Sequence, residues 1–104
     1  MNRNKVKALN KYINEILKPI YPEVKKFELL SLEIYGEYLL RIIVDDESIT
    51  EKNMYQKGID PHYILKHIQE FLKYFEPKEE IEITVIIGRP NGEIVYRSNF
   101  FEKM

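Results

Sequence analysis

Three consecutive acidic residues, Asp45-Asp46-Glu47, are the first candidates for chemistry in this sequence, because clustered carboxylates bind divalent cations and transfer protons. They follow branched apolar residues in the stretch IIVDDESITEKN, residues 42–53. Neighbouring residues of a strand point to opposite faces, so three adjacent carboxylates cannot all reach one ion. The glycines of a calcium-binding loop are also missing. We therefore interpret the three acids as the solvated end of a β-hairpin and expect no metal site there.

The histidines of the chain, His62 and His67, are the next candidates. Their spacing of five residues places them about 140° apart around a helix axis. Two histidines that share a metal ion from one helix are instead three or four residues apart. We interpret both as surface residues without a catalytic partner.

No nucleophile or phosphate-binding motif is present. The serines lie outside the sequence contexts of known serine nucleophiles. The segment 88–92 is rich in turn formers, but it lacks the Gly-Lys-Ser/Thr ending of a phosphate loop and leads into a strand. Arg89 in this segment is expected to be an exposed loop arginine. The chain has no cysteine, which excludes thiolate chemistry, cysteine zinc sites and disulfides. We therefore expect no enzyme activity, no catalytic residue, no cofactor and no metal.

Length and charge limit the remaining possibilities. The 104 residues fit a single α+β domain over residues 1–104, and 44% of them are hydrophobic, enough for a core. Residues 1–27 carry seven basic and two acidic side chains, and residues 28–60 carry three and eight. Nucleic-acid-binding domains normally present a basic face, so a basic first helix is only a weak indication. Without a leader-like segment or a membrane-length apolar run, we expect a cytoplasmic protein that makes no membrane contact.

The elements that would position these residues can be predicted from periodicity. Residues 3–18 place apolar side chains at helical spacing, and Pro19 and Pro22 end this helix. Its apolar stripe consists of Val6, Leu9, Ile13, Ile16 and Leu17.

Residues 27–46 (FELLSLEIYGEYLLRIIVDD) are typical of a β-hairpin. A two-residue turn at Gly36-Glu37 would place Tyr35 opposite Tyr38. The side chains expected to face the helices are Leu30, Leu32, Ile34, Leu40, Ile42 and Val44.

Ser48 and Glu51 have the spacing of a capping box, which predicts a short helix or turn over residues 52–55, ended by Gly58. A longer helix begins with Asp60 as N-cap and Pro61 in its first turn. It ends before Pro77, and its buried stripe consists of Ile64, Leu65, Ile68, Phe71, Leu72 and Phe75.

A second hairpin is expected over residues 81–101, with alternating Ile81, Ile83, Val85 and Ile87 facing the helices. The resulting order is α-β-β-α-β-β. It predicts an α+β, two-layer sandwich in which a four-stranded, mainly antiparallel sheet carries two helices on one face.

The sheet face away from the helices is the most informative surface. It would receive Phe27, Leu29, Tyr35, Leu39, Arg41, Ile43 and Ile86, together with either Val95, Arg97 and Phe101 or Ile94, Tyr96 and Phe100. A solvated antiparallel face is mostly polar, whereas aliphatic, aromatic and arginine side chains are enriched at interfaces. The alternative is that the C-terminal segment or the loop of residues 45–60 covers this face.

We therefore expect a non-catalytic protein-interaction domain that uses this face, either as a homodimer or as an inhibitor or immunity-type partner of another protein. The candidate partner-binding residues are Tyr35, Leu39, Arg41, Ile43, Tyr96, Arg97 and Phe101. Aromatic and arginine side chains on an open sheet also suit RNA stacking, so an RNA- or ribosome-associated accessory protein is the alternative, disfavoured by the glutamates of the first hairpin.

Two family resemblances agree with these alternatives. The segment LLRIIVDDESITEKN, residues 39–53, resembles the N-terminal domain of the ribosome maturation factor RimP, where a strand ending in Asp leads through Ile-Thr into a helix. That family's Ser-Pro-Gly stretch and second domain are absent from the sequence. The order of elements up to ITVIIGRPNGEIVYRSNFF, residues 83–101, is similar to that of small YezG-like immunity proteins paired with nuclease toxins. The first resemblance implies ribosome assembly, and the second implies toxin inhibition.

Overall fold

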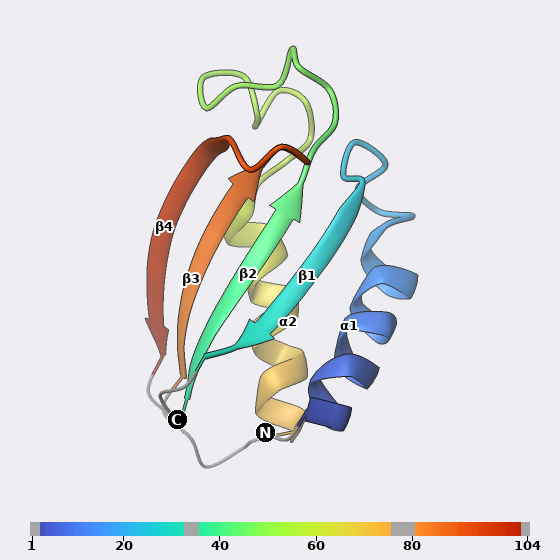
Figure 1. Cartoon of the computed structure of the whole chain (residues 1–104), viewed down its shortest axis with the longest axis vertical. Helices are drawn as coiled ribbons and strands as arrows, with labels where there is room; N and C mark the ends of the chain where they lie inside the picture. The colour runs from blue at the N-terminus through green and yellow to red at the C-terminus, as the bar shows by residue number, and fades with distance from the viewer. Residues whose placement is uncertain (1–2, 33–35, 76–80, 103–104) are drawn as a thin grey trace.

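The computed structural model describes residues 3–32, 36–75 and 81–102, which form two helices and a four-stranded sheet (Figure 1). The elements follow in the order α1 (Arg3–Leu17), β1 (Lys26–Ser31), β2 (Glu37–Ile43), α2 (Pro61–Phe75), β3 (Ile81–Gly88) and β4 (Ile94–Glu102). The predicted α+β class and the order α-β-β-α-β-β are confirmed.

The strands lie side by side in the order β1-β2-β3-β4. The pairs β1–β2 and β3–β4 are antiparallel, and the central pair β2–β3 is parallel. Parallel neighbours need a crossover connection, and here α2 carries the chain back from the end of β2 to the start of β3. The sheet is therefore mixed and mostly antiparallel.

Both helices belong to one layer. Figure 1 shows α2 behind the strands and α1 along the β1 side of the sheet. The rings of Tyr12 on α1 and Phe71 on α2 meet edge to face, with centroids 5.0 Å apart. Between the helices and the sheet lies a core to which α1, β1, β2, α2 and β3 contribute buried side chains, among them Leu9, Ile13, Leu17, Phe27, Leu40, Ile42, Ile64, Ile68, Leu72, Ile83 and Val85.

Alternation along the central strands is as predicted. The side chains that were expected to face the helices from β2 and β3 are buried, and their neighbours are half-buried on the opposite face. The confirmed core residues are Leu40, Ile42, Val44, Ile81, Ile83, Val85 and Ile87.

The face assignment predicted for β1 is wrong. Leu29 pairs with Leu40, and cross-strand partners lie on one face, so Leu29 is buried in the core. Phe27 is buried on the same side. Leu30 and Leu32, which were predicted to face the helices, are exposed.

The predicted two-residue turn at residues 36–37 is wrong as well. Tyr38 pairs with Ser31 and therefore cannot pair with Tyr35. The remaining positions of that prediction, Ile34 and Tyr35, lie outside the described residues.

The segment between β2 and α2 is made of turns. The predicted capping box is wrong, because the Ser48 hydroxyl donates to Asp46 Oδ1 at 2.7 Å and Asn53 Oδ1 accepts from Thr50 N–H at 2.7 Å. The predicted turn ended by a glycine is confirmed, since Gly58 has a φ of +85°, a left-handed conformation that favours glycine.

The start of α2 follows the prediction closely. Asp60 Oδ1 accepts from the backbone N–H of His62 at 2.9 Å and of Tyr63 at 3.4 Å. Pro61 is the first residue of the helix, where a missing N–H has no cost. In α1, by contrast, Ile16 was predicted to be part of the buried stripe and is 41% exposed. No helix within the described residues combines the length and hydropathy of a membrane span.

Candidate interaction surface

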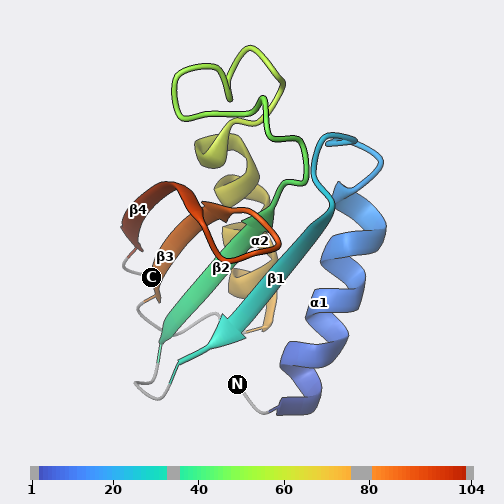
Figure 2. The same cartoon turned by 45° about the horizontal axis from the view of Figure 1, so that its top comes forward.

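The sheet face opposite the helices, here called the open face, is not covered by any described segment. Figures 1 and 2 show α2 behind the strands, α1 along the β1 side of the sheet, and the segment of residues 44–60 beyond the ends of β2 and β3. The predicted alternative, that this segment folds over the face, is therefore wrong. From the strand pairing, the open face carries Lys26, Glu28, Leu30, Glu37, Leu39, Arg41, Ile43, Glu82, Thr84, Ile86 and Arg97.

An ion pair joins β1 to β2 on the open face. Arg41 Nη1 on β2 donates to Glu28 Oε1 on β1 at 3.0 Å, and Lys26 Nζ lies 3.4 Å from the other carboxylate oxygen. The side chains of Arg41 and Glu28 are 36% and 23% exposed, so water still screens the pair and its contribution to stability is about 1 kcal/mol or less. The Arg41 guanidinium is thus oriented by a contact within the chain.

Apolar side chains flank this ion pair. Leu30 and Leu39 are cross-strand partners on one side of it, and Ile86 on β3 is the neighbour of Arg41 on the other. Ile43 lies at the far end of β2. The open face therefore combines aliphatic surface with a preformed charged group, as the core and rim of protein interfaces do.

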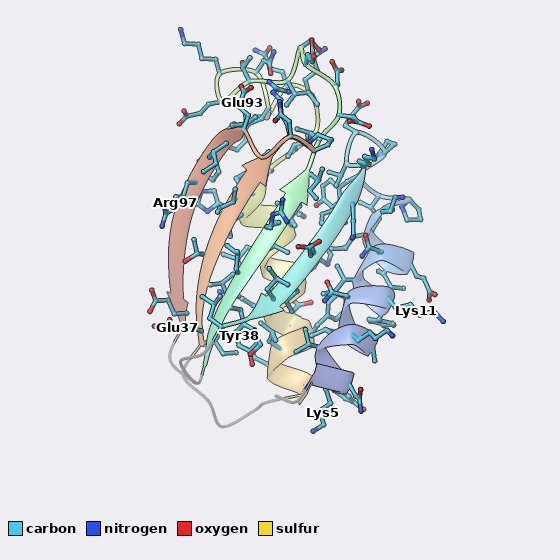
Figure 3. The ribbon with its side chains drawn as sticks, in the orientation of Figure 1. Lys5, Lys11, Glu37, Tyr38, Glu93 and Arg97 are labelled. Atoms are coloured by element: carbon cyan, nitrogen blue, oxygen red, sulfur yellow. The ribbon has the colours of Figure 1, made fainter. Side chains whose placement is uncertain are left out.

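The charges of the open face are balanced. Lys26, Arg41 and Arg97 are matched by three glutamates at positions 28, 37 and 82. The lysines of the basic first helix lie elsewhere: Figure 3 shows Lys5 and Lys11 on α1, pointing away from the sheet. Among the described residues, the open face therefore lacks the concentrated positive charge that favours binding to a phosphate backbone.

The structure brings four of the seven candidate partner-binding residues together. Leu39, Arg41 and Ile43 alternate along β2 on the open face. Arg97 is the partner of Ile86 and lies on the same face, at the outer edge of the sheet (Figure 3). Their role in binding stays a prediction.

The remaining three candidates differ from this group. Tyr96 pairs with Ile87 and packs against the core, so its assignment to the open face is wrong. The bulge at Ile87/Gly88 shifts the register of β4 by one residue and thereby places Tyr96 on the helix side of the sheet. Phe101 pairs with Glu82, which gives its backbone an open-face position, and its side chain is outside the described part. Tyr35 is also outside it.

Two of the three consecutive acidic residues, Asp45 and Asp46, have side-chain partners. Asp45 pairs with Lys25 at 3.1 Å. Asp46 accepts from the backbone N–H and the hydroxyl of Ser48 at 2.9 and 2.7 Å, and these hydrogen bonds lower the pKa of Asp46. Within the described residues, no group of three histidine or acidic side chains is arranged to hold a metal ion. The interpretation of this stretch as a solvated strand end agrees with this geometry.

Arg89 has a role that the sequence analysis missed. Its guanidinium donates to the backbone carbonyl oxygens of Asp46, Glu47 and Ile49 at 3.0, 3.3 and 2.8 Å. Only 13% of its side chain is exposed. The expectation that Arg89 is an exposed loop residue is therefore wrong. Its hydrogen bonds connect the segment after β2 to the β3–β4 turn. Its position next to Pro90 gave no local signal for contacts some forty residues away.

The helix layer also exposes two tyrosines, Tyr12 and Tyr74, that the sequence analysis did not single out. Tyr12, Glu70, Phe71 and Tyr74 line a groove between α1 and α2. Tyr74 is 83% exposed there. Both tyrosines lie outside the apolar stripes of their helices, and this position in the sequence already indicated that they would be exposed.

Two asparagines of α1 cover the outer edge of β1. Asn10 Nδ2 donates to Leu29 O, and Leu29 N–H donates to Asn10 Oδ1, both at 2.6 Å. One turn later, Asn14 makes the same pair of bonds with Phe27, at 2.7 and 2.9 Å. The side-chain amides thus replace the peptide groups of a further strand.

Comparisons with known proteins add no identification: no family model, curated protein or solved structure matches this chain significantly. The functional argument therefore rests on the geometry of the chain itself.

Proposed function

We propose that this protein is a non-catalytic protein-interaction domain that binds another protein through the open face. The observation that carries the proposal is a sheet face that no described segment covers, with Leu39, Ile43 and Ile86 around the oriented Arg41. Arginine is enriched at binding hot spots, and the less energetic contacts around a hot spot serve to exclude water from it. An inhibitor or immunity-type role, in the cytoplasm, suits a cysteine-free chain that acts by presenting a surface.

Arginine is well suited to such a role because its guanidinium presents several donors in a fixed plane. In the Arg41–Glu28 pair one nitrogen, Nη1, is the donor, at 3.0 Å. A partner carboxylate that approaches the open face would find the guanidinium already in place. The entropy lost on binding is then smaller than for a mobile lysine.

The test compares variants that differ only in which surface they change. Ile43→Asp places a charge in the apolar part of the open face, and Arg41→Glu combined with Glu28→Arg reverses the ion pair without removing it. Tyr74→Asp is the matched control, because Tyr74 is 83% exposed and lines the groove between the two helices instead of the open face. Each protein is immobilised and used to capture partners from a lysate of the native host, after circular dichroism shows that it is folded.

A protein captured by the wild type and by Tyr74→Asp, but lost from both open-face variants, supports the proposal. Capture that is lost only from Tyr74→Asp contradicts it and assigns binding to the helix layer. Copurifying RNA whose removal by RNase abolishes the association contradicts it too, and favours the RNA-associated alternative. Loss of a single hot-spot residue is expected to weaken binding by about 2 kcal/mol or more, roughly thirtyfold.

A further inference from the structure

The two edges of the sheet differ in whether their outward backbone groups are covered by other residues. β1 forms one edge and β4 the other. Edge strands present unpaired N–H and C=O groups that can pair with another chain, so proteins usually cover or interrupt them.

The β1 edge is closed by a geometric match. Four residues of helix rise about 6 Å, and two residues of strand rise about 6.6 Å. Asn10 and Asn14 are four apart on α1, and Leu29 and Phe27 are two apart on β1, so each amide meets one outward-facing peptide group. No incoming strand can reach these groups without displacing the amides.

The direction of the backbone groups in β4 follows from the rest of the sheet. Glu82 N–H donates to Gly36 O at 2.9 Å, and Gly88 O accepts from Val44 N–H at 2.9 Å, so even-numbered residues of β3 bond to β2. Successive residues of a strand bond to opposite sides, so odd-numbered residues of β3 bond to β4. Their partners in β4 are even-numbered. Arg97, Asn99 and Phe101 therefore direct their N–H and C=O groups outward.

No described residue protects the outer side of β4 in the way that Asn10 and Asn14 protect β1. With nine residues, β4 is the longest of the described strands, and it contains no proline. Its bulge lies at the end near Gly88 and leaves residues 96–102 in regular pairing with β3. The described part of the chain provides no further strand beyond it.

We propose that β4 pairs with β4 of a second copy of this chain, antiparallel, so that two four-stranded sheets become one continuous sheet. A twofold axis at Ser98 uses the whole strand, because it places Ile94 opposite Glu102 of the second copy. The same register places Arg97 opposite Asn99, so no like charges face each other. A register one step earlier would oppose Arg97 to itself, which is unfavourable.

The closed β1 edge explains why the assembly stops at two. A chain with two open edges can add copies without limit, whereas one open edge paired with itself forms a closed, isologous dimer. The axis is perpendicular to the sheet, so both open faces lie on the same side of the dimer. This pairing does not depend on the proposed function of the open face.

The first experiment is light scattering of the full chain over a range of concentrations. Dimers of the 12.6 kDa chain are expected. Asn99→Pro removes an outward N–H but no bond to β3, because residue 99 does not donate to β3, and proline is tolerated on the outer side of an edge strand. It should raise the dimer dissociation constant roughly tenfold or more, since lost hydrogen bonds and the proline ring both oppose pairing. Asn99→Ala, which keeps the N–H, should remain dimeric.

Amide hydrogen exchange of the wild type gives a second measurement, in case Asn99→Pro does not fold. The amides of Arg97, Asn99 and Phe101 should become protected as the concentration rises, while those of Ser98 and Phe100 are protected throughout. A monomer at every concentration, or a dimer in which the outward amides exchange freely, overturns the proposal. Ile43→Asp should remain dimeric, so failure of the open-face function and failure of this pairing are distinguishable.

Discussion

Arg89 is the residue on which the segment after β2 depends. Its guanidinium donates to three backbone carbonyl oxygens, those of Asp46, Glu47 and Ile49, and so links this segment to the β3–β4 turn. We expect Arg89→Lys to lower the free energy of unfolding by about 2 kcal/mol, because an ammonium cannot reach all three oxygens. Urea unfolding measures this change. Arg97→Lys on the exposed edge is the control and should change stability by less than about 0.5 kcal/mol; equal effects of the two variants would contradict this role of Arg89.

Asp46 makes the stability of the folded state depend on pH. The hydrogen bonds from Ser48 lower the pKa of the Asp46 carboxyl below its ordinary value of 3.8. A carboxyl whose pKa is lowered on folding stabilises the folded state above its unfolded pKa, and this stabilisation is lost as the pH falls through the folded pKa. Ser48→Ala should return the pKa of Asp46 toward 3.8 in an NMR titration, while Thr50→Ala should not. An unchanged titration in Ser48→Ala would show that another group causes the shift.

At the scale of elements, α1 both packs on the core and closes the sheet edge. Replacing Asn10 and Asn14 by alanine leaves the outward groups of Phe27 and Leu29 to water in a half-covered groove. We expect each substitution to cost about 1 kcal/mol of unfolding free energy. Asn4→Ala, at an exposed position of the same helix, is the control and should cost less.

The double variant Asn10→Ala, Asn14→Ala has a consequence beyond stability. With both edges open, dimers should associate further into larger species, which light scattering or sedimentation detects as concentration-dependent growth. A variant that is destabilised but has an unchanged oligomeric state would show that the amides stabilise β1 without guarding its edge.

At the scale of the whole molecule, one core joins both hairpins and both helices. Buried side chains from α1, β1, β2, α2 and β3 contact one another across the parallel β2–β3 pair. We therefore expect a single cooperative unfolding transition in urea, with a slope of about 1–2 kcal/mol per M. Tyrosine fluorescence and far-ultraviolet circular dichroism should give the same midpoint. Separate midpoints would show that the two hairpins unfold independently.

Local features of the sequence determined the elements and much of the core. Asp60 and Pro61 define the start of α2 because a side-chain acceptor and a residue without N–H suit the first turn of any helix. The alternation of Ile81, Ile83, Val85 and Ile87 identifies the buried face of β3 because side chains of a strand alternate. These signals act over a few residues and are independent of distant partners. The open-face positions Leu39, Arg41 and Ile43 were predictable for the same reason.

Only the tertiary structure decided the registers, the edges and the role of Arg89. Both faces of β1 are apolar enough to be buried, so its pairing with β2 decided that Leu29, not Leu30, enters the core. The bulge at Gly88 decided on which face Tyr96 lies. Asn10 and Asn14 look like ordinary polar residues of a helix until β1 lies beside them. Each of these outcomes depends on which distant backbone groups come within hydrogen-bonding distance, and that information is not contained in local periodicity.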